Sequence, residues 1–106
     1  MKTIRNIDYY QDSINYILDI QASDGSIPWE RDKKLDPWDH IESAMALTVA
    51  GKIEAARKAY EWIKLNQEEA GGWYSEYKSG IPSNRRIETN FSAYICVGIW
   101  HFYLVT

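Results

Sequence analysis

Hydrophobic positions along this chain recur with a helical period and predict four helices separated by polar loops. In the first helix, residues 6–21, steps of three and four residues place the apolar side chains on one stripe: Ile7, Tyr10, Ile14, Ile17 and Leu18. Polar side chains such as Asp12 and Asp19 lie off this stripe. The pattern is typical of a helix with one buried face and one solvated face.

The other three predicted helices alternate in character. Residues 39–51 follow Pro37 and are apolar nearly all round, which indicates a helix buried on every side. Residues 53–67 again have one apolar stripe and one charged face. Residues 89–106 are apolar on nearly every face, whereas residues 68–86, rich in Gly, Ser and Pro, are expected to form a loop.

The order amphipathic, buried, amphipathic, buried indicates two helical hairpins, each with an outer and an inner helix. The chain also repeats itself, because Gln21 and Gln67 are 46 residues apart, as are Gly25 and Gly71. We therefore expect an all-α fold of about four helices. It would be a single domain over residues 1–106, built from two internal repeats at about 6–51 and 52–106.

Composition narrows the class of protein. A chain of 106 residues with 45% hydrophobic and 25% charged residues fits one small globular domain. The net charge of −3 supplies no basic patch for nucleic acid. The most apolar stretch, residues 91–105, is shorter than the roughly 20 residues of a membrane span. Cys96 is the single cysteine and the start shows no signal peptide, so we expect a cytoplasmic protein.

Glutamine and tryptophan recur together after both amphipathic helices. The segment Gln67-Glu68-Glu69-Ala70-Gly71-Gly72-Trp73 resembles the QW motif of squalene-hopene cyclases and related α/α toroids. The segment from Gln21 through Gly25 to Trp29 resembles a looser copy. A glutamine at a helix end can bond free carbonyls while the tryptophan packs over that end, so the motif is structural and not catalytic.

A longer run strengthens this resemblance. Trp38-Asp39-His40-Ile41-Glu42-Ser43-Ala44-Met45-Ala46-Leu47, with Glu88-Thr89-Asn90-Phe91 later, is similar to bacterial prenyltransferase-like proteins of unassigned function. The resemblance covers nearly the whole chain and implies an α/α toroid of the terpenoid-cyclase and prenyltransferase type. Such toroids close with about six hairpins, and this chain supplies about two. We therefore expect a partial toroid whose exposed flanks are covered in a homo-oligomer, either a ring-closing trimer or a dimer.

Candidate chemistry lies at the starts of the two buried helices, which would line one mouth of a toroid cavity. The candidates for lining a ligand are Trp38, Asp39, His40 and Asn90, with Trp29 and Tyr74 nearby. Glu42 and Glu88 are the acid–base candidates. Carboxylates beside aromatic faces suit a sugar, whereas an apolar aromatic cavity suits an isoprenoid and its carbocation.

Each candidate also has a structural interpretation. Asp39 and Glu42 have the spacing of a capping box, and Thr89 or Asn90 suits an ordinary N-cap. His40 suits a structural or solvent-facing role, and His101 and Cys96 suit the core. Cys96 and His101 lie on different helix faces and no second cysteine exists, so neither a metal site nor a cofactor is expected.

Three functions remain open from the sequence. The first is a prenyltransferase- or cyclase-like domain that binds a small molecule, with an unassigned reaction. The second is a non-catalytic structural or assembly module, or a truncated piece of a longer toroid enzyme. The third is a carbohydrate-active toroid. The Asp-x-Asp-Asp signature of cyclases is absent and the zinc ligands of protein prenyltransferases are not recognisable, so enzymatic activity itself is left open.

Overall fold

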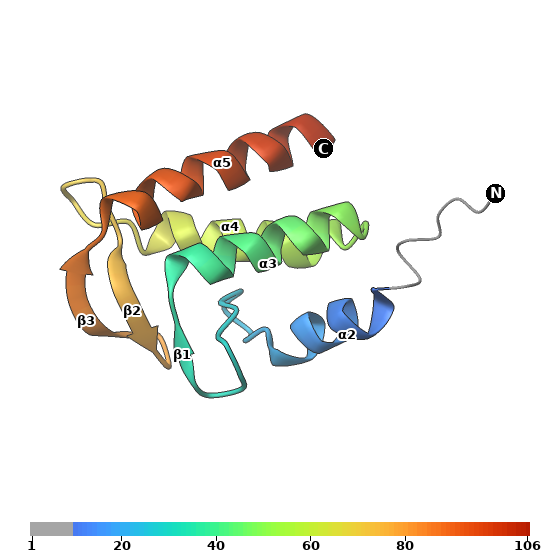
Figure 1. Cartoon of the computed structure of the whole chain (residues 1–106), viewed down its shortest axis with the longest axis horizontal. Coiled ribbons are helices and arrows are strands. Elements are labelled where there is room, and N and C mark those ends of the chain that lie inside the picture. The colour runs from blue at the N-terminus through green and yellow to red at the C-terminus, as the bar shows by residue number, and fades with distance from the viewer. Residues whose placement is uncertain (1–9) are drawn as a thin grey trace.

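The computed structural model describes residues 10–106, so the beginning of the first expected helix, with Ile7, lies outside the described residues. The elements in chain order are α2 (Gln11–Ile20), β1 (Lys34–Leu35), α3 (Pro37–Val49), α4 (Ile53–Leu65), β2 (Tyr74–Lys78), β3 (Ile81–Ile87) and α5 (Thr89–Val105) (Figure 1). These four helices match the four expected helical segments to within a few residues.

A small antiparallel sheet stands beside the helices, in the strand order β1-β2-β3. The fold is therefore mixed α/β, and the prediction of an all-α fold built as an α/α toroid is wrong. The expected loop at residues 68–86 contains the β2–β3 hairpin, which turns at Ser79 and Gly80. Both turn residues have positive φ, 52° and 80°, as a two-residue hairpin turn requires.

The pattern of hydrophobic residues did not predict the hairpin, because few of the hairpin residues are buried. In β2, Ser75 and Tyr77 are buried on one side of the strand, and Tyr77 is part of the hydrophobic core. In β3, six of the seven residues are exposed. A strand that is exposed to solvent on both faces does not show the alternation of apolar and polar residues by which strands are recognised.

Helix α3 packs against both α4 and α5, and Figure 1 shows α4 behind α3 with α5 above them. It begins at Pro37, two residues before its predicted start, because Asp36 is its N-cap. The Oδ1 atom of Asp36 accepts a hydrogen bond of 2.9 Å from the backbone N–H of Asp39. Asp before a first-turn Pro is a strong combination for starting a helix, and the same capping bond fixes the side chain of Asp36.

Two groups of buried side chains form the core on either side of α3. One fills the space where α2, α3 and α4 meet and comprises Ile14, Ile20, Ile27, Ala44, Leu47, Ala56 and Ala59. The other joins α3 and α4 to the sheet and to α5 and comprises Leu35, Ile41, Trp62, Ile63, Trp73, Tyr77 and Ile95. The core thus holds the first turns of α3 rigidly between the loop before it and α5.

The two glutamine–tryptophan segments have different geometries. Nε2 of Gln67 donates to the Gly71 carbonyl at 2.8 Å, and the indole of buried Trp73 donates to the Ile63 carbonyl at 2.7 Å. Gln21 likewise bonds the Gly25 carbonyl at 3.0 Å. Its tryptophan partner, however, does not pack over the helix end. Trp29 is instead half-exposed, and its indole bonds Asp36 at the start of α3.

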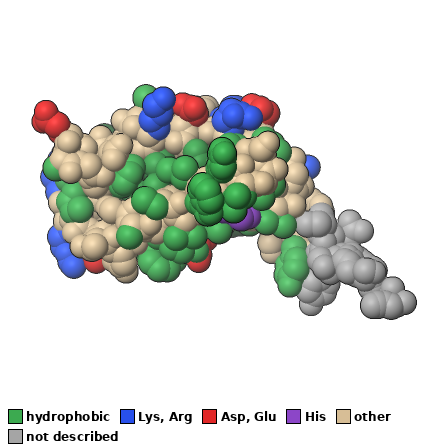
Figure 2. Space-filling model, turned by 90° about the horizontal axis from the view of Figure 1, so that it is seen from above, with side chains coloured by type: hydrophobic (Ala, Val, Ile, Leu, Met, Phe, Trp, Pro, Cys, Tyr) green, Lys and Arg blue, Asp and Glu red, His purple; other side chains and the backbone are tan. Residues whose placement is uncertain are grey.

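Helix α5 was expected to be buried on every side, and this is wrong for the described structure. Ile95 and Gly98 are its buried residues, whereas Cys96 and most of the large apolar side chains are exposed. Figure 2, which views the molecule from above, shows hydrophobic side chains gathered over this part of the surface. No described helix has the length and apolar character needed to cross a membrane.

Candidate functional site

Three carboxylates follow one another at the start of α3: Asp36, Asp39 and Glu42. We call them the acidic strip. Residues three apart on a helix are neighbours on its surface, so the strip lies along one side of the first two turns. Asp36 and Asp39 are half-buried, and Glu42 is exposed.

Asp36 is held by two donors, one on each carboxylate oxygen. Oδ1 accepts from the backbone N–H of Asp39 at 2.9 Å, and Oδ2 accepts from Nε1 of Trp29 at 2.8 Å. The second bond is charge-assisted and ties the loop before β1 to the helix start. Asp36 therefore orients the Trp29 ring beside the acidic strip as well as capping the helix.

The carboxyl group of Asp39 has an unusual proton affinity. Burial is the main cause, followed by the negative charge of Asp36, a hydrogen bond with it, and the charge of Glu42. Together these raise the pKa of Asp39 from 3.8 to about 6, against a smaller lowering effect of the Trp29 indole. A carboxyl group that keeps its proton close to neutral pH can act as a general acid.

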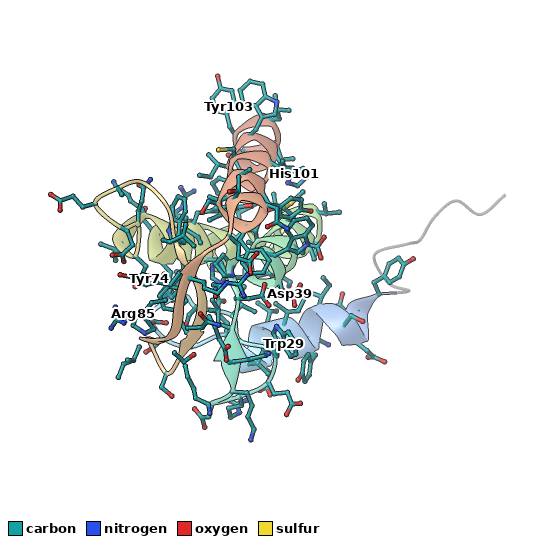
Figure 3. All side chains as sticks on the ribbon, turned by 60° about the vertical axis from the view of Figure 1, so that its left-hand side comes forward. Trp29, Asp39, Tyr74, Arg85, His101 and Tyr103 are labelled. Carbon is teal, nitrogen blue, oxygen red and sulfur yellow. The ribbon has the colours of Figure 1, made fainter. Side chains whose placement is uncertain are left out.

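Asp39 and Ser43 line one wall of an open depression of about 430 Å³. Trp29 is 49% exposed at its rim, and the hydroxyl of Tyr16 donates to the Trp29 carbonyl at 3.2 Å. Figure 3 shows Trp29 and Asp39 close together where the chain enters α3. An aromatic ring, hydroxyl groups and a carboxyl group around one hollow provide both the apolar and the polar contacts that a sugar ring needs.

Aromatic side chains also flank the other side of the strip. Trp38 stacks on Tyr94 of α5, with ring centroids 4.2 Å apart and planes at 5°. Phe91 meets the Trp38 ring edge-on at 6.3 Å. The Tyr94 hydroxyl donates to Oε2 of Glu42 at 3.1 Å. The starts of α3 and α5 are thus brought together, with both Trp38 and Glu42 in contact with Tyr94.

His40 lies in the core and does not line a cavity. The backbone N–H of Ile27 donates to its Nδ1 at 3.1 Å, so Nε2 carries the proton and donates to the Ala59 carbonyl at 2.9 Å. Complete burial lowers the pKa of His40 to about 4 and keeps the ring neutral. His40 therefore has a structural role in the core, and the prediction that it lines a ligand site is wrong.

Glu88 and Asn90 lie apart from the strip's hydrogen bonds. Glu88 pairs with Arg86 at 3.1 Å, and Asn90 is exposed in the first turn of α5. The N-cap position of this helix is Glu88, without a side-chain capping bond, so the prediction of a cap at Thr89 or Asn90 is wrong. Within residues 10–106, neither side chain forms a hydrogen bond or an ion pair with the acidic strip.

Asp36 is the site residue that the sequence did not reveal. The sequence pattern predicts a helix over residues 39–51, which leaves Asp36 outside it. The dipeptide Asp36-Pro37 could have predicted the true start of the helix, because a capping residue followed by a first-turn proline is typical of a helix N-terminus. Among the described side chains, no group of three His, Cys, Asp or Glu residues is placed to hold a metal ion.

No protein-family model matches this chain. Over 90 residues, which are 85% of the chain, it is 42% identical to the MMP endo-(1,4)-3-O-methyl-alpha-D-mannosidase of Mycolicibacterium hassiacum. The matched part is 25% of the length of that enzyme. The resemblance to terpenoid cyclases and prenyltransferases is therefore wrong, because the similarity is to one quarter of a glycan-active enzyme.

Proposed function

We propose that this chain acts on α-linked mannose glycans and that the acidic strip contains its proton donor. The observation that carries the proposal is the state of Asp39: half-buried beside Asp36, with a pKa raised to about 6, and lining a depression rimmed by Trp29. The mannosidase relative supports the same class of substrate independently of this geometry. Of the three functions left open by the sequence, the carbohydrate-active one is favoured.

Glycoside hydrolysis needs two carboxyl groups in different protonation states. Asp39 supplies the protonated one, which donates to the oxygen of the leaving sugar as the glycosidic bond breaks. A water molecule then adds to the anomeric carbon and gives its proton to a second carboxylate. We assign that role to Glu42, which is exposed three residues further along α3 and accepts a hydrogen bond from the Tyr94 hydroxyl. Glu88 is the less suitable candidate because its carboxylate forms an ion pair with Arg86.

The aromatic surfaces on both sides of the strip suit a methylated sugar. Pyranose rings present C–H groups that pack on aromatic faces, and a methyl ether adds apolar surface while removing a hydroxyl donor. Trp29 offers such a face near Asp39, on the side of its ring that Lys34 Nζ, 4.2 Å from the ring centroid, does not cover. The Trp38–Tyr94 stack is a second aromatic surface, at the starts of α3 and α5. We therefore propose (1,4)-linked 3-O-methyl-α-D-mannose, the unit named for the relative, as the substrate unit.

An isoprenoid ligand suits this surface poorly. Activated isoprenoids carry a diphosphate, and a strip of three carboxylates repels that charge. No cation from the described part of the chain bonds to the strip to offset this repulsion.

The test uses the purified chain and an oligosaccharide of (1,4)-linked 3-O-methyl-α-D-mannose. Calorimetry measures binding, and release of reducing ends measures hydrolysis. Asp39→Asn should retain binding but lose hydrolysis by about 100-fold or more, the usual contribution of a general acid. Asp12→Asn on the exposed side of α2 is the matched control and should behave like the wild type.

Three results would contradict the proposal in whole or in part. Equal hydrolysis by Asp39→Asn and the wild type would exclude Asp39 as the proton donor. Absence of binding to any mannose glycan would exclude the substrate class. Binding by the wild-type chain without any hydrolysis would replace the catalytic role with that of a glycan-binding module.

A further inference from the structure

Helix α5 presents a second apolar stripe on its solvent side. Its members recur at steps of three and four residues, all are exposed, and we call them the α5 outer face: Ala93, Cys96, Val97, Trp100, Tyr103 and Leu104. The three largest are 60%, 68% and 63% exposed in the order Trp100, Tyr103, Leu104. A contiguous apolar patch of this kind on a small protein marks an interaction surface.

The opposite side of α5 is fixed against the rest of the molecule. Ile95 is buried in the core, and a Cβ added at Gly98 would lie 2.5 Å from Cγ2 of Ile41. This close packing leaves α5 no freedom to rotate its outer face inward. The apolar stripe is thus available to another molecule while the fold of residues 10–106 stays as it is.

The α5 outer face carries no charge. The helix from Thr89 to Val105 contains no Asp, Glu, Lys or Arg. A binding partner therefore has to bring an uncharged surface, because an unpaired charge buried against this helix would be costly. A second α5 meets that condition.

Side-chain size changes along the α5 outer face. Its first half has small residues, Ala93 and Cys96, and its second half has the large residues Trp100, Tyr103 and Leu104. The Trp100 and Tyr103 rings stack at 5.3 Å and 24°, which makes one rigid ridge. The face is therefore a notch followed by a ridge along one straight helix.

We propose that this face binds a second copy of the chain, with the two α5 helices antiparallel about a two-fold axis that crosses the outer face at the level of residue 98. Antiparallel pairing places the ridge of each copy against the notch of the other. Trp100 of one chain then lies over Cys96 and Val97 of its partner, and the reverse contact forms at the same time. Such a self-complementary arrangement is the defining property of a two-fold interface.

The expected contact area agrees with a weak dimer. An aromatic side chain buries roughly 150–250 Å² in a core or interface, so Trp100 and Tyr103, which are 60% and 68% exposed, supply about 250 Å² per copy. The smaller side chains add a similar amount, which brings the total for two copies to about 1,000 Å². This is near the lower limit for a specific interface, so the dimer should dissociate on dilution.

Light scattering across a dilution series tests the proposal. At high concentration the chain should have twice the mass of one chain and approach the single mass on dilution. Trp100→Lys should weaken the dimer at least tenfold, because it places a charge in the interface. Ile81→Lys is the matched control: it charges another exposed apolar residue, at the hairpin turn, and should leave the dimer unchanged.

A size-exchange pair tests the register. Cys96→Trp should fill the notch and abolish the dimer, and adding Trp100→Ala to it should restore the dimer. Circular dichroism of each variant shows that the monomer keeps its fold. A wild-type chain that stays monomeric at every concentration would overturn the proposal. So would a dimer unaffected by Trp100→Lys, or binding of the face to neutral lipid vesicles in place of a second copy.

Discussion

The indole N–H of Trp29 bonds Oδ2 of Asp36 at 2.8 Å, and this bond joins the exposed aromatic ring of the site to the residue that starts α3. The other oxygen of Asp36 receives the backbone N–H of Asp39. One carboxylate thus positions the aromatic platform, begins the helix and raises the pKa of the proposed acid.

Replacing Asp36 separates these roles. Asp36→Asn keeps an N-cap but removes the charge, so the pKa of Asp39 should fall from about 6 toward 3.8. Asp36→Ala removes the cap as well and should destabilise the protein by about 1–2 kcal/mol. Carbon-detected NMR titration of the Asp39 carboxyl group measures the first effect and thermal unfolding the second. An unchanged titration in Asp36→Asn would show that Asp36 does not act on Asp39.

The pH dependence of stability should show two opposing contributions. Asp39 has a pKa raised by the fold, so its contribution is complete below pH 3.8 and is lost as pH rises through about 6. His40 has a pKa lowered by the fold, so its contribution is complete above pH 6.5 and is lost as pH falls through about 4.

Between pH 4 and 6 the two effects therefore partly cancel. Asp39→Asn removes one of them, and its free energy of unfolding should rise more steeply with pH over this window than that of the wild type. Urea denaturation at several pH values measures the slope. Parallel curves for the two proteins would mean that the fold does not perturb the proton affinity of Asp39.

Truncating His40 should be costly because both ring nitrogens are used in the core. His40→Ala leaves the Ile27 N–H and the Ala59 carbonyl without partners and opens a cavity. The expected loss of stability is about 3 kcal/mol or more. Glu61→Ala on the exposed face of α4 should change stability by less than about 0.5 kcal/mol. A His40→Ala protein as stable as this control would contradict the buried hydrogen bonds.

Trp29 should contribute directly to sugar affinity. Trp29→Ala removes the aromatic face at the rim of the depression, and affinity for the mannose oligosaccharide should fall about tenfold. Trp100→Ala removes another exposed indole, on α5, and should leave affinity unchanged. Calorimetry measures both. Equal losses in the two variants would indicate nonspecific sugar contacts and not a site beside Asp39.

Two glycines with similar backbone angles should differ in their tolerance of a side chain. Gly25 has φ +96°, and a Cβ there would lie 2.1 Å from the Lys58 carbonyl oxygen. Gly51 has φ +81° with open space around it. Gly51→Ala should cost about 1–2 kcal/mol for the backbone conformation alone, and Gly25→Ala clearly more. Equal melting temperatures would contradict the close packing of the Gly25 turn on α4.

The sequence was most informative where one face of an element is buried. The stripes of α2 and α4 and the apolar body of α3 predicted those helices. The β2–β3 hairpin was not predicted because its second strand is exposed to solvent on both faces. In addition, the two strands pair through backbone hydrogen bonds, which leave no pattern in the side chains. The sequence did not predict that one side of α5 is exposed, because an apolar pattern is the same for a helix face that is buried and for one that is exposed.

The candidate site was partly predicted. Trp38 and Glu42 do meet across the starts of two helices, through Tyr94, whereas Asp39 lines the depression beside Trp29. His40 was placed in the site because it is a neighbour of Asp39 in sequence, but the helical rotation between adjacent residues turns it into the core. The importance of Asp36 depends on its bond to Trp29, a contact between a loop and a helix end that no local pattern contains.

The most direct test of the central claim is the pH profile of kcat/KM for hydrolysis of the (1,4)-linked 3-O-methyl-α-D-mannose oligosaccharide. With Asp39 as general acid, the rate should fall above pH about 6, and Asp36→Asn should move this descending limb to lower pH. A limb that stays in place in Asp36→Asn, or one that persists in Asp39→Asn, would contradict the assignment of Asp39 as the proton donor.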